Sequence, residues 1–274
     1  MTEIKHIDLT AYDDVENLDR FNENSFINYC NEKLGGCTKH INFINKYIIN
    51  NQWNGRVLEI GSGNSKLLYR LEKENLITNV GYGYEISKSR FNFAEKLKDY
   101  VNSKKVVNYN EDFLSSNLVH KELDLIIAVD IVLQLISPLK RNAESLLLKK
   151  IYKMLKKGGY FLIELWDFIN ILKLINLAEN KELKIWEQFP KSDPFEYGLY
   201  NITLDKQKNI VWEKTFIERK NKNKSYFCNI LKPYSKNIIK ELLRINKFKN
   251  VNIFNRWSDN EKQVLGEYIV LARK

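Results

Sequence analysis

The chain has 274 residues, of which 44% are hydrophobic and 28% are charged, and this length is sufficient for one large α/β domain with a substantial core. We expect no secretory signal, because residues 1–14 contain no basic segment followed by an apolar run. We also expect no membrane anchor, because the most apolar stretch, around Asp130, is shorter than the ~20 residues that a membrane span needs. The three cysteines are widely scattered and lack the paired spacing of metal ligands, so we expect reduced thiols, a cytoplasmic location and no metal site.

The net charge of +10 is concentrated near the C-terminus. Residues 201–274 contain 17 Lys and Arg against 7 Asp and Glu, whereas residues 1–200 contain 27 of each kind. Part of this excess is ERKNKNKS at 218–225, which is typical of a solvated turn between two strands. The alternative interpretation is a surface that attracts phosphate-bearing partners.

In chain order, residues 1–35 predict a helical N-terminal arm and residues 38–50 predict a helix. Strands and helices then alternate: strands are predicted at 56–60, 79–86, 105–110, 124–130 and 160–165, and helices at 65–75, 87–102 and 137–159. Apolar strands that alternate with amphipathic helices predict a parallel sheet covered on both faces.

The alternation ends after residue 165. Residues 166–200 are aromatic-rich and are predicted to be irregular or helical, and residues 200–232 alternate like antiparallel strands. A helix at 235–247 and strands at 251–254 and 267–274 complete the chain. We therefore predict a single α/β domain over residues 1–274, with a doubly wound seven-stranded sheet, an N-terminal arm or lid at 1–35, and an antiparallel insertion after strand five at 166–232 that roofs the site.

Polar and glycine-containing segments stand at the carboxyl ends of successive predicted strands, the edge at which open α/β sheets bind ligands. In VLEIGSGNSKLL at 57–68, Glu59 precedes Gly61 and Gly63, and glycines let the backbone approach a ligand closely. Glu85 closes the second strand 22 residues after Gly63, a spacing that suits an acid binding both hydroxyls of a ribose.

The next two strand ends continue this series. Asp112 and Phe113 follow the third strand, where the acid is able to accept a hydrogen bond from an adenine amine and the ring to lie against the base. Asp130 ends the fourth strand. Because the carboxyl ends of parallel strands meet at one edge, the sequence predicts one binding site there.

This ordered set resembles the class I S-adenosylmethionine-dependent methyltransferases over roughly residues 40–165. The resemblance implies a Rossmann-like fold and S-adenosylmethionine as cofactor, with the methionyl part at the glycine turn, the ribose at the acid of strand two and the adenine at the Asp-aromatic pair. The implied cofactor-binding residues are Glu59, Gly61, Ser62, Gly63, Glu85, Ile86, Asp112, Phe113 and Asp130. Two positions depart from the family pattern: Ser65 replaces the third glycine of the turn, and Leu135 replaces a histidine common after strand four.

A nicotinamide dehydrogenase is the main alternative for the same turn. Its Gly-x-Gly-x-x-Gly fingerprint requires a glycine where this chain has Lys66. An acid two residues before the first glycine, such as Glu59, is typical of methyltransferases and not of dehydrogenases. The turn therefore favours the methyltransferase.

The methyl acceptor is less constrained by the sequence. The Asn-Pro-Pro-aromatic and Pro-Cys motifs of DNA-methylating enzymes and a separate RNA-binding module are absent from the sequence. The insertion after strand five resembles that of small-molecule enzymes of this class, and Glu164-Leu165-Trp166 resembles a step in N-methyltransferases of nucleotide-linked amino sugars. We therefore predict O- or N-methylation of a polar small molecule, with phosphate-bearing molecules among the candidates and a nucleotide-activated sugar or cell-surface glycan precursor as the preferred class. Neither membrane nor nucleic-acid partners are expected. The oligomeric state stays unassigned.

Two alternatives to this function stay open. One is an RNA-directed methyltransferase that uses the basic C-terminal quarter. The other is a non-catalytic adenosyl-binding scaffold, against which the intact turn, Glu85 and Asp112 count.

The remaining candidates surround the acceptor. Glu164 and Asp167, at the mouth of the fifth strand, are candidate catalytic bases, because a hydroxyl acceptor must lose a proton. Trp166, Tyr197 and Tyr200 are candidate substrate-binding residues in the roof. An aromatic face near the sulfonium would gain a cation–π attraction of ~0.5–2 kcal/mol.

Overall fold

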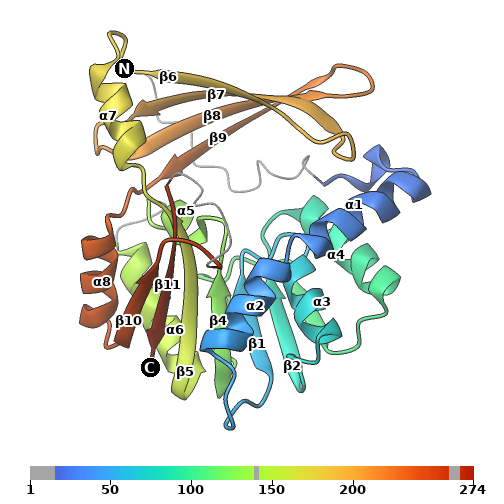
Figure 1. The fold of residues 1–274 in the computed structure, drawn as a ribbon, viewed down its shortest axis with the longest axis vertical. Helices are drawn as coiled ribbons and strands as arrows, with labels where there is room; N and C mark the ends of the chain where they lie inside the picture. The colour runs from blue at the N-terminus through green and yellow to red at the C-terminus, as the bar shows by residue number, and fades with distance from the viewer. Residues whose placement is uncertain (1–15, 139–141, 259–265) are drawn as a thin grey trace.

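The computed structural model describes residues 16–138, 142–258 and 266–274, and it contains a seven-stranded sheet in the order β10-β11-β5-β4-β1-β2-β3 (Figure 1). Its strands are β1 (Arg56–Ile60), β2 (Val80–Tyr84), β3 (Val106–Tyr109), β4 (Leu123–Ala128), β5 (Leu155–Trp166), β10 (Lys249–Phe254) and β11 (Glu267–Arg273). β1 to β5 are parallel, whereas β11 runs antiparallel to both β5 and β10. The predicted Rossmann-like α/β fold class is confirmed.

Amphipathic helices bury both faces of this sheet. One face packs against α1 (Glu23–Gly35), α2 (Thr38–Tyr47), α3 (Lys66–Lys73) and α4 (Lys88–Val101), and a short 3-10 helix, η2 (Leu18–Arg20), precedes them. The other face packs against α5 (Val132–Ile136), α6 (Ala143–Met154) and α8 (Lys236–Ile245). β4 is buried at every position, as expected of a central strand covered on both sides.

The helix predicted at 137–159 is wrong at both ends. α6 spans only Ala143–Met154, and β5 already begins at Leu155, with an irregular register against β4. Gly158 lies inside β5 at φ 80°, and a Cβ on Gly159 would stand 2.8 Å from the carbonyl oxygen of Leu123. The Lys-Lys-Gly-Gly run therefore passes tightly beside β4 as a bulged strand, because glycine permits this path and no other residue would fit.

A second, antiparallel sheet lies across the carboxyl edge of the parallel strands (Figure 1). It has the order β6-β7-β8-β9, with β6 (Leu183–Gln188), β7 (Phe195–Leu204), β8 (Ile210–Glu218) and β9 (Lys224–Leu231), and α7 (Ile169–Leu177) precedes it. The expectation of an irregular or helical segment at 166–200 therefore missed β6 and the start of β7. A small apolar cluster that includes Ile131, Phe168 and Ile202 fixes this sheet to the main body.

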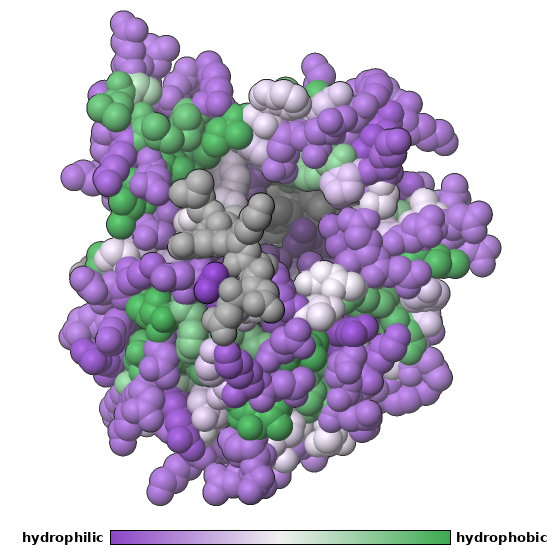
Figure 2. Space-filling view, viewed as in Figure 1, coloured by the Kyte–Doolittle hydropathy of each residue, from purple (hydrophilic) through white to green (hydrophobic). Residues whose placement is uncertain are grey.

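The surface is hydrophilic over most of the face in Figure 2, with hydrophobic residues gathered over α7 and β6. Leu177 and Trp186 are the most exposed of these, at 82% and 66%. None of the described helices combines the length and the apolar composition that crossing a membrane requires.

Candidate active site

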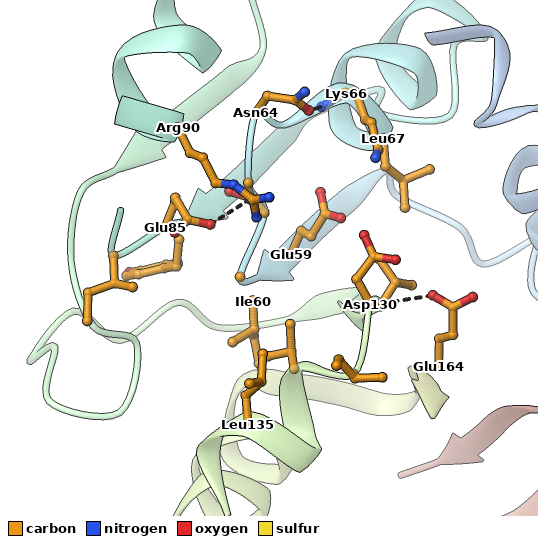
Figure 3. A pocket seen from close by; sticks show the side chains of 18 of the residues that line it. Glu59, Ile60, Asn64, Lys66, Leu67, Glu85, Arg90, Asp130, Leu135 and Glu164 are labelled. Atoms are coloured by element: carbon orange, nitrogen blue, oxygen red, sulfur yellow. Dashed lines mark hydrogen bonds between the residues drawn. The ribbon is translucent and has the colours of Figure 1, made fainter. Parts of the chain in front are cut away.

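A cavity of about 680 Å³ lies at the carboxyl ends of β1, β2, β4 and β5, under the second sheet (Figure 3). β1 pairs with β2 on one side and with β4 on the other, so the chain changes direction across the sheet at β1. Ligands of doubly wound sheets bind at such a switch point. The nine residues predicted to bind the cofactor all line this cavity: Glu59, Gly61, Ser62, Gly63, Glu85, Ile86, Asp112, Phe113 and Asp130.

The turn after β1 is left-handed at three positions. Gly61, Gly63 and Ser65 have φ values of 64°, 56° and 57°. A Cβ on Gly61 would lie 2.6 Å from Cγ2 of Val132, so this position requires glycine on steric grounds as well. Ser65, which stands where the family pattern has a third glycine, adopts the left-handed conformation and begins α3.

Glu59 presents a buried carboxyl group whose Oε2 has no hydrogen-bond partner in the described part of the chain. Burial raises the pKa of Glu59 to about 8; Lys66 opposes this rise, and the charges of Asp130 and Glu85 add to it. A buried carboxyl group without a partner fits a cationic ligand atom, because the cation would supply the missing contact and favour the ionised form. The α-ammonium of S-adenosylmethionine is such a group.

Glu85 is held in place by two backbone amides of the same rim. Its Oε2 accepts a hydrogen bond from Gly63 N at 2.8 Å and its Oε1 accepts one from Ser87 N at 2.8 Å. A carboxylate has about four lone-pair sites, so both oxygens are still able to accept hydroxyl donors. The geometry fits a ribose diol.

Asp112 and Phe113 form the wall beyond Glu85. Asp112 Oδ1 accepts a hydrogen bond from Leu114 N at 2.9 Å, which closes the turn, and Phe113 packs edge-on against Tyr84 with ring centroids 5.1 Å apart. Phe113 is buried at this position. The pair therefore offers one acceptor atom and one fixed ring to a ligand, as a purine requires.

Asp130 reaches the cavity from a strained turn after β4. Asp130 and Ile131 have φ values of 53° and 60°, which is uncommon outside glycine and rare for a β-branched residue. Desolvation by the surrounding protein would raise the pKa of Asp130, whose side chain is exposed to the cavity, but Lys66, with His40 and Arg90, holds it below its usual range. The cavity therefore contains an ionised carboxylate at this point.

The two predicted catalytic acids are separated by the structure. Glu164 lines the cavity together with Trp166, and its Oε2 accepts a hydrogen bond from Asp130 N at 2.8 Å (Figure 3). Asp167 is absent from the described lining; its Oδ1 accepts a hydrogen bond from Ile169 N at 3.0 Å at the start of α7.

The roof presents other aromatic residues than the sequence predicts. Tyr197 and Tyr200 on β7 are not among the described lining residues, whereas Trp212 and Lys214 on β8 are. Trp212 packs against Trp166 with centroids 5.7 Å apart, and Nζ of Lys214 lies 4.2 Å from the centroid of the Trp212 ring. The two residues are two positions apart on a strand and therefore share a face. The alternation of residues 210–218 in the sequence indicates this shared face.

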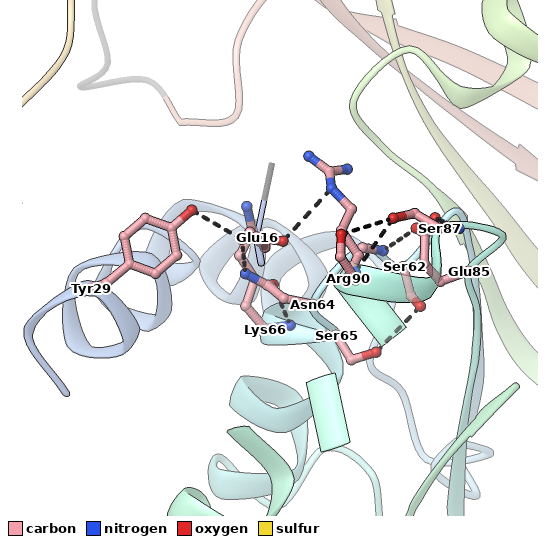
Figure 4. Close-up of polar contacts among 11 residues, drawn as sticks. Glu16, Tyr29, Ser62, Asn64, Ser65, Lys66, Glu85, Ser87 and Arg90 are labelled. Atoms are coloured by element: carbon pink, nitrogen blue, oxygen red, sulfur yellow. Dashed lines mark hydrogen bonds and ion pairs between the residues drawn. The ribbon is translucent and has the colours of Figure 1, made fainter. Parts of the chain in front are cut away.

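A polar network at the glycine turn also escaped sequence reasoning (Figure 4). Glu16 is 4% exposed and accepts hydrogen bonds from Tyr29 Oη at 3.0 Å and from Asn64 Nδ2 at 2.7 Å. Its Oε2 lies 3.6 Å from Nε of Arg90 on α4. The residues of the predicted arm up to position 15 lie outside the described chain, but Glu16 itself reaches the cavity rim.

The sequence matches a family model described as a methyltransferase domain over residues 51–210, which is more than half of the chain. No curated protein sequence is similar to this one at a significant level. Among solved structures, an S-adenosylmethionine-dependent methyltransferase from Clostridium acetobutylicum is similar with a TM-score of 0.68 at 14% identity, over 86% of this chain and 90% of that chain.

Two further structures are similar over most of their length. The CcbJ methyltransferase from Streptomyces caelestis has a TM-score of 0.65 at 12% identity, over 86% of this chain and 88% of that one. An amino pentose methyltransferase from Micromonospora echinaspora has a TM-score of 0.58 at 11% identity, over 90% of this chain and 92% of that one. At these identities the likeness establishes the shared fold, and the family match carries the activity. The chain therefore belongs to the methyltransferase domain family, as an enzyme whose methyl donor is S-adenosylmethionine.

Proposed function

We propose that this methyltransferase acts on a polar small molecule, with a nucleotide-activated sugar or a related glycan precursor as the preferred class. The observation that carries the proposal is the roofed cavity: the second sheet closes over the donor-binding edge and leaves about 680 Å³, a size typical of small-molecule sites. The amino pentose methyltransferase among the similar structures supports the same class of acceptor.

The acceptor end of the cavity combines aromatic surface with one buried cation. Trp166 and Trp212 form a wall between β5 and β8, and Lys214, 8% exposed, lies beside it. A sugar ring packs well on aromatic faces, and an ammonium group binds phosphate as a point charge. Among the described Lys and Arg residues after position 200, Lys214 is the one that lines the cavity, so the phosphate hypothesis depends on this residue rather than on the overall basic charge.

In this proposal each residue of the donor half has one task. Glu59 binds the α-ammonium, Glu85 the ribose, and Asp112 with Phe113 the adenine. S-adenosylmethionine, when bound, supplies an already activated methyl group, so the chain has only to align the acceptor, exclude water and accept a proton where the acceptor is a hydroxyl.

Asp130 is our preferred group for contact with the reacting centre. It is ionised and faces the cavity, whereas Asp167 is not in the lining and Glu164 already accepts a hydrogen bond on each oxygen. We therefore assign Glu164 the task of holding Asp130, in place of the base role that its position in the sequence predicts.

Methyl transfer from labelled S-adenosylmethionine to a panel of nucleotide sugars, amino sugars and an RNA oligonucleotide tests the proposal. We expect transfer to a sugar nucleotide and none to RNA. With that acceptor, Lys214→Gln should raise KM severalfold and leave the donor Kd unchanged. Lys220→Gln, which removes the same charge from an exposed turn, should resemble the wild type. Equal KM values for the two variants would contradict the assignment of Lys214.

A further inference from the structure

Two carboxyl groups on neighbouring strands meet at a single indole N–H beneath the cavity. Trp257 Nε1 donates to Glu164 Oε1 on β5 at 2.9 Å and to Glu267 Oε1 on β11 at 2.7 Å. The shared donor brings the Oε1 atoms of the two carboxyl groups close together. Trp257 and Glu164 are 2% and 5% exposed, so water screens this contact little.

A pair of carboxyl groups in such contact holds one proton, because two adjacent carboxylates repel each other strongly in a buried site. Nζ of Lys39 on α2 lies 3.5 Å from Glu267 Oε1, which favours the ionised form of Glu267. Burial, the neighbouring Glu267 carboxyl group and the charge of Asp130 raise the pKa of Glu164 to about 8. The shared proton therefore resides on Glu164 at neutral pH.

The surroundings of the pair add one more titratable group. His40 on α2 packs against the Trp257 ring with centroids 4.4 Å apart. Burial, with the charge of Lys39, lowers the pKa of His40 to about 4, so its imidazole is neutral beside the pair. The titratable side chains that face the two carboxyl groups from neighbouring elements are thus those of Lys39, His40 and Asp130.

The pair is connected to the reacting edge through one backbone amide. Glu164 Oε2 accepts the hydrogen bond from Asp130 N at 2.8 Å, and Asp130 stands in the left-handed turn with φ 53°. This hydrogen bond fixes a backbone conformation that the residue does not favour by itself. The side chain of Asp130 enters the cavity from that turn.

We propose that Glu267 and Trp257 are positioning residues for methyl transfer: the Trp257 N–H, held between the carboxyl groups of Glu267 and Glu164, keeps the Glu164 carboxyl in the orientation that fixes the Asp130 turn. The inference rests on the proposed contact of Asp130 with the sulfonium end of the donor. It does not depend on the identity of the acceptor, so the first test below uses the unliganded protein and the second uses the donor and its demethylated product.

The first test is infrared spectroscopy with isotope-labelled glutamate on the unliganded protein at pH 7. In a Glu59→Gln background, which removes the other carboxyl with a raised pKa, one protonated-carboxyl band should remain. Glu164→Gln should remove it. Glu267→Gln should shift the frequency of the band without removing it, because burial and the charge of Asp130 still keep the proton on Glu164 while the neighbouring carboxyl group is gone. A band at an unchanged frequency in Glu267→Gln would overturn the proposal.

The second test compares the affinities for S-adenosylmethionine and S-adenosylhomocysteine, which differ in the sulfonium charge. Glu267→Gln and Trp257→Phe should weaken the binding of S-adenosylmethionine roughly fivefold to tenfold more than the binding of S-adenosylhomocysteine. This difference corresponds to one lost charge-assisted hydrogen bond. Glu241→Gln, an exposed change on α8, should weaken neither. Equal losses for both ligands in the two variants would mean a merely structural role and would refute the inference.

Discussion

Replacing Glu59 by glutamine should change how the stability of the unliganded protein depends on pH. Burial raises the pKa of this carboxyl from 4.5 to about 8 in the folded protein. Between these values the unfolded chain has lost the proton that the folded protein retains. The contribution of Glu59 to the free energy of unfolding is therefore fully present below pH 4.5 and is lost as the pH rises to about 8.

The magnitude follows from that pKa difference. Each pH unit between the two pKa values removes about 1.4 kcal/mol, so the wild type should lose roughly 3–4 kcal/mol through this group between pH 5 and pH 8. Glu59 is 3% exposed, so solvent screening removes little of this effect. Glutamine has the same shape and does not titrate, and the variant should therefore lack this part of the decline.

Urea unfolding of the wild type and the variant at several pH values from about 5 to 8 measures the difference. The stability of Glu59→Gln relative to the wild type should improve steadily with pH over this range. Ser62→Ala, a change in the same turn that removes no titrating group, should shift the free energy of unfolding by a constant amount. Parallel pH curves for Glu59→Gln and the wild type would refute the reasoning, since the carboxyl would then titrate alike in both states.

Three further outcomes are expected. Binding of S-adenosylmethionine at pH 7 should release close to one proton, because the ammonium group of the donor favours the ionised form of Glu59. The Glu59→Gln variant should release none. Calorimetry in buffers of different ionisation enthalpy measures the number of protons released. Gly61→Ala should lower the free energy of unfolding by about 1–2 kcal/mol through the left-handed φ alone. Adding Val132→Ala to that variant removes the 2.6 Å contact between the new Cβ and Val132 Cγ2, and should restore only part of the lost melting temperature. Glu16→Gln should weaken the ion pair to Arg90 and raise the donor Kd severalfold, and an unchanged Kd in calorimetry would remove Glu16 from the site.

The residues that line the cavity at the ends of β1 to β4 were predictable because their signals are local. The glycine turn and the acids at the strand ends occur within short, periodic segments, and a parallel sheet brings the strand ends together whatever the rest of the chain does. The strands β1 and β4 were predictable as well, because each is a short apolar run that is recognisable from the local sequence. This part of the site therefore required no knowledge of tertiary packing.

The aromatic end of the cavity depends on contacts that local patterns specify only in part: alternation places Trp212 and Lys214 on one face of β8, but it does not say which face of β8 covers the cavity. Trp212 on β8 faces the cavity and packs on Trp166, whereas Tyr197 and Tyr200, which were expected from their place in the roofing insertion, are not among the described lining residues. Glu267 and Trp257 lie about 100 residues after Glu164, and only the antiparallel pairing of β11 with β5 brings the strands together. The bulge at Gly158 and Gly159 likewise exists because β4 lies beside it.

The second sheet pairs strand to strand within itself, and within the described part of the chain it shares no ladder with the seven-stranded sheet. The β8 residues that we propose to face the acceptor are thus carried on a sheet whose strand pairing is separate from that of the strands that carry Glu59, Glu85 and Asp130. On that proposal, substitutions on the inner face of β8 change the choice of acceptor and leave donor binding unchanged. Divergence of substrate range within one unchanged donor site is the evolutionary route that this architecture makes easy.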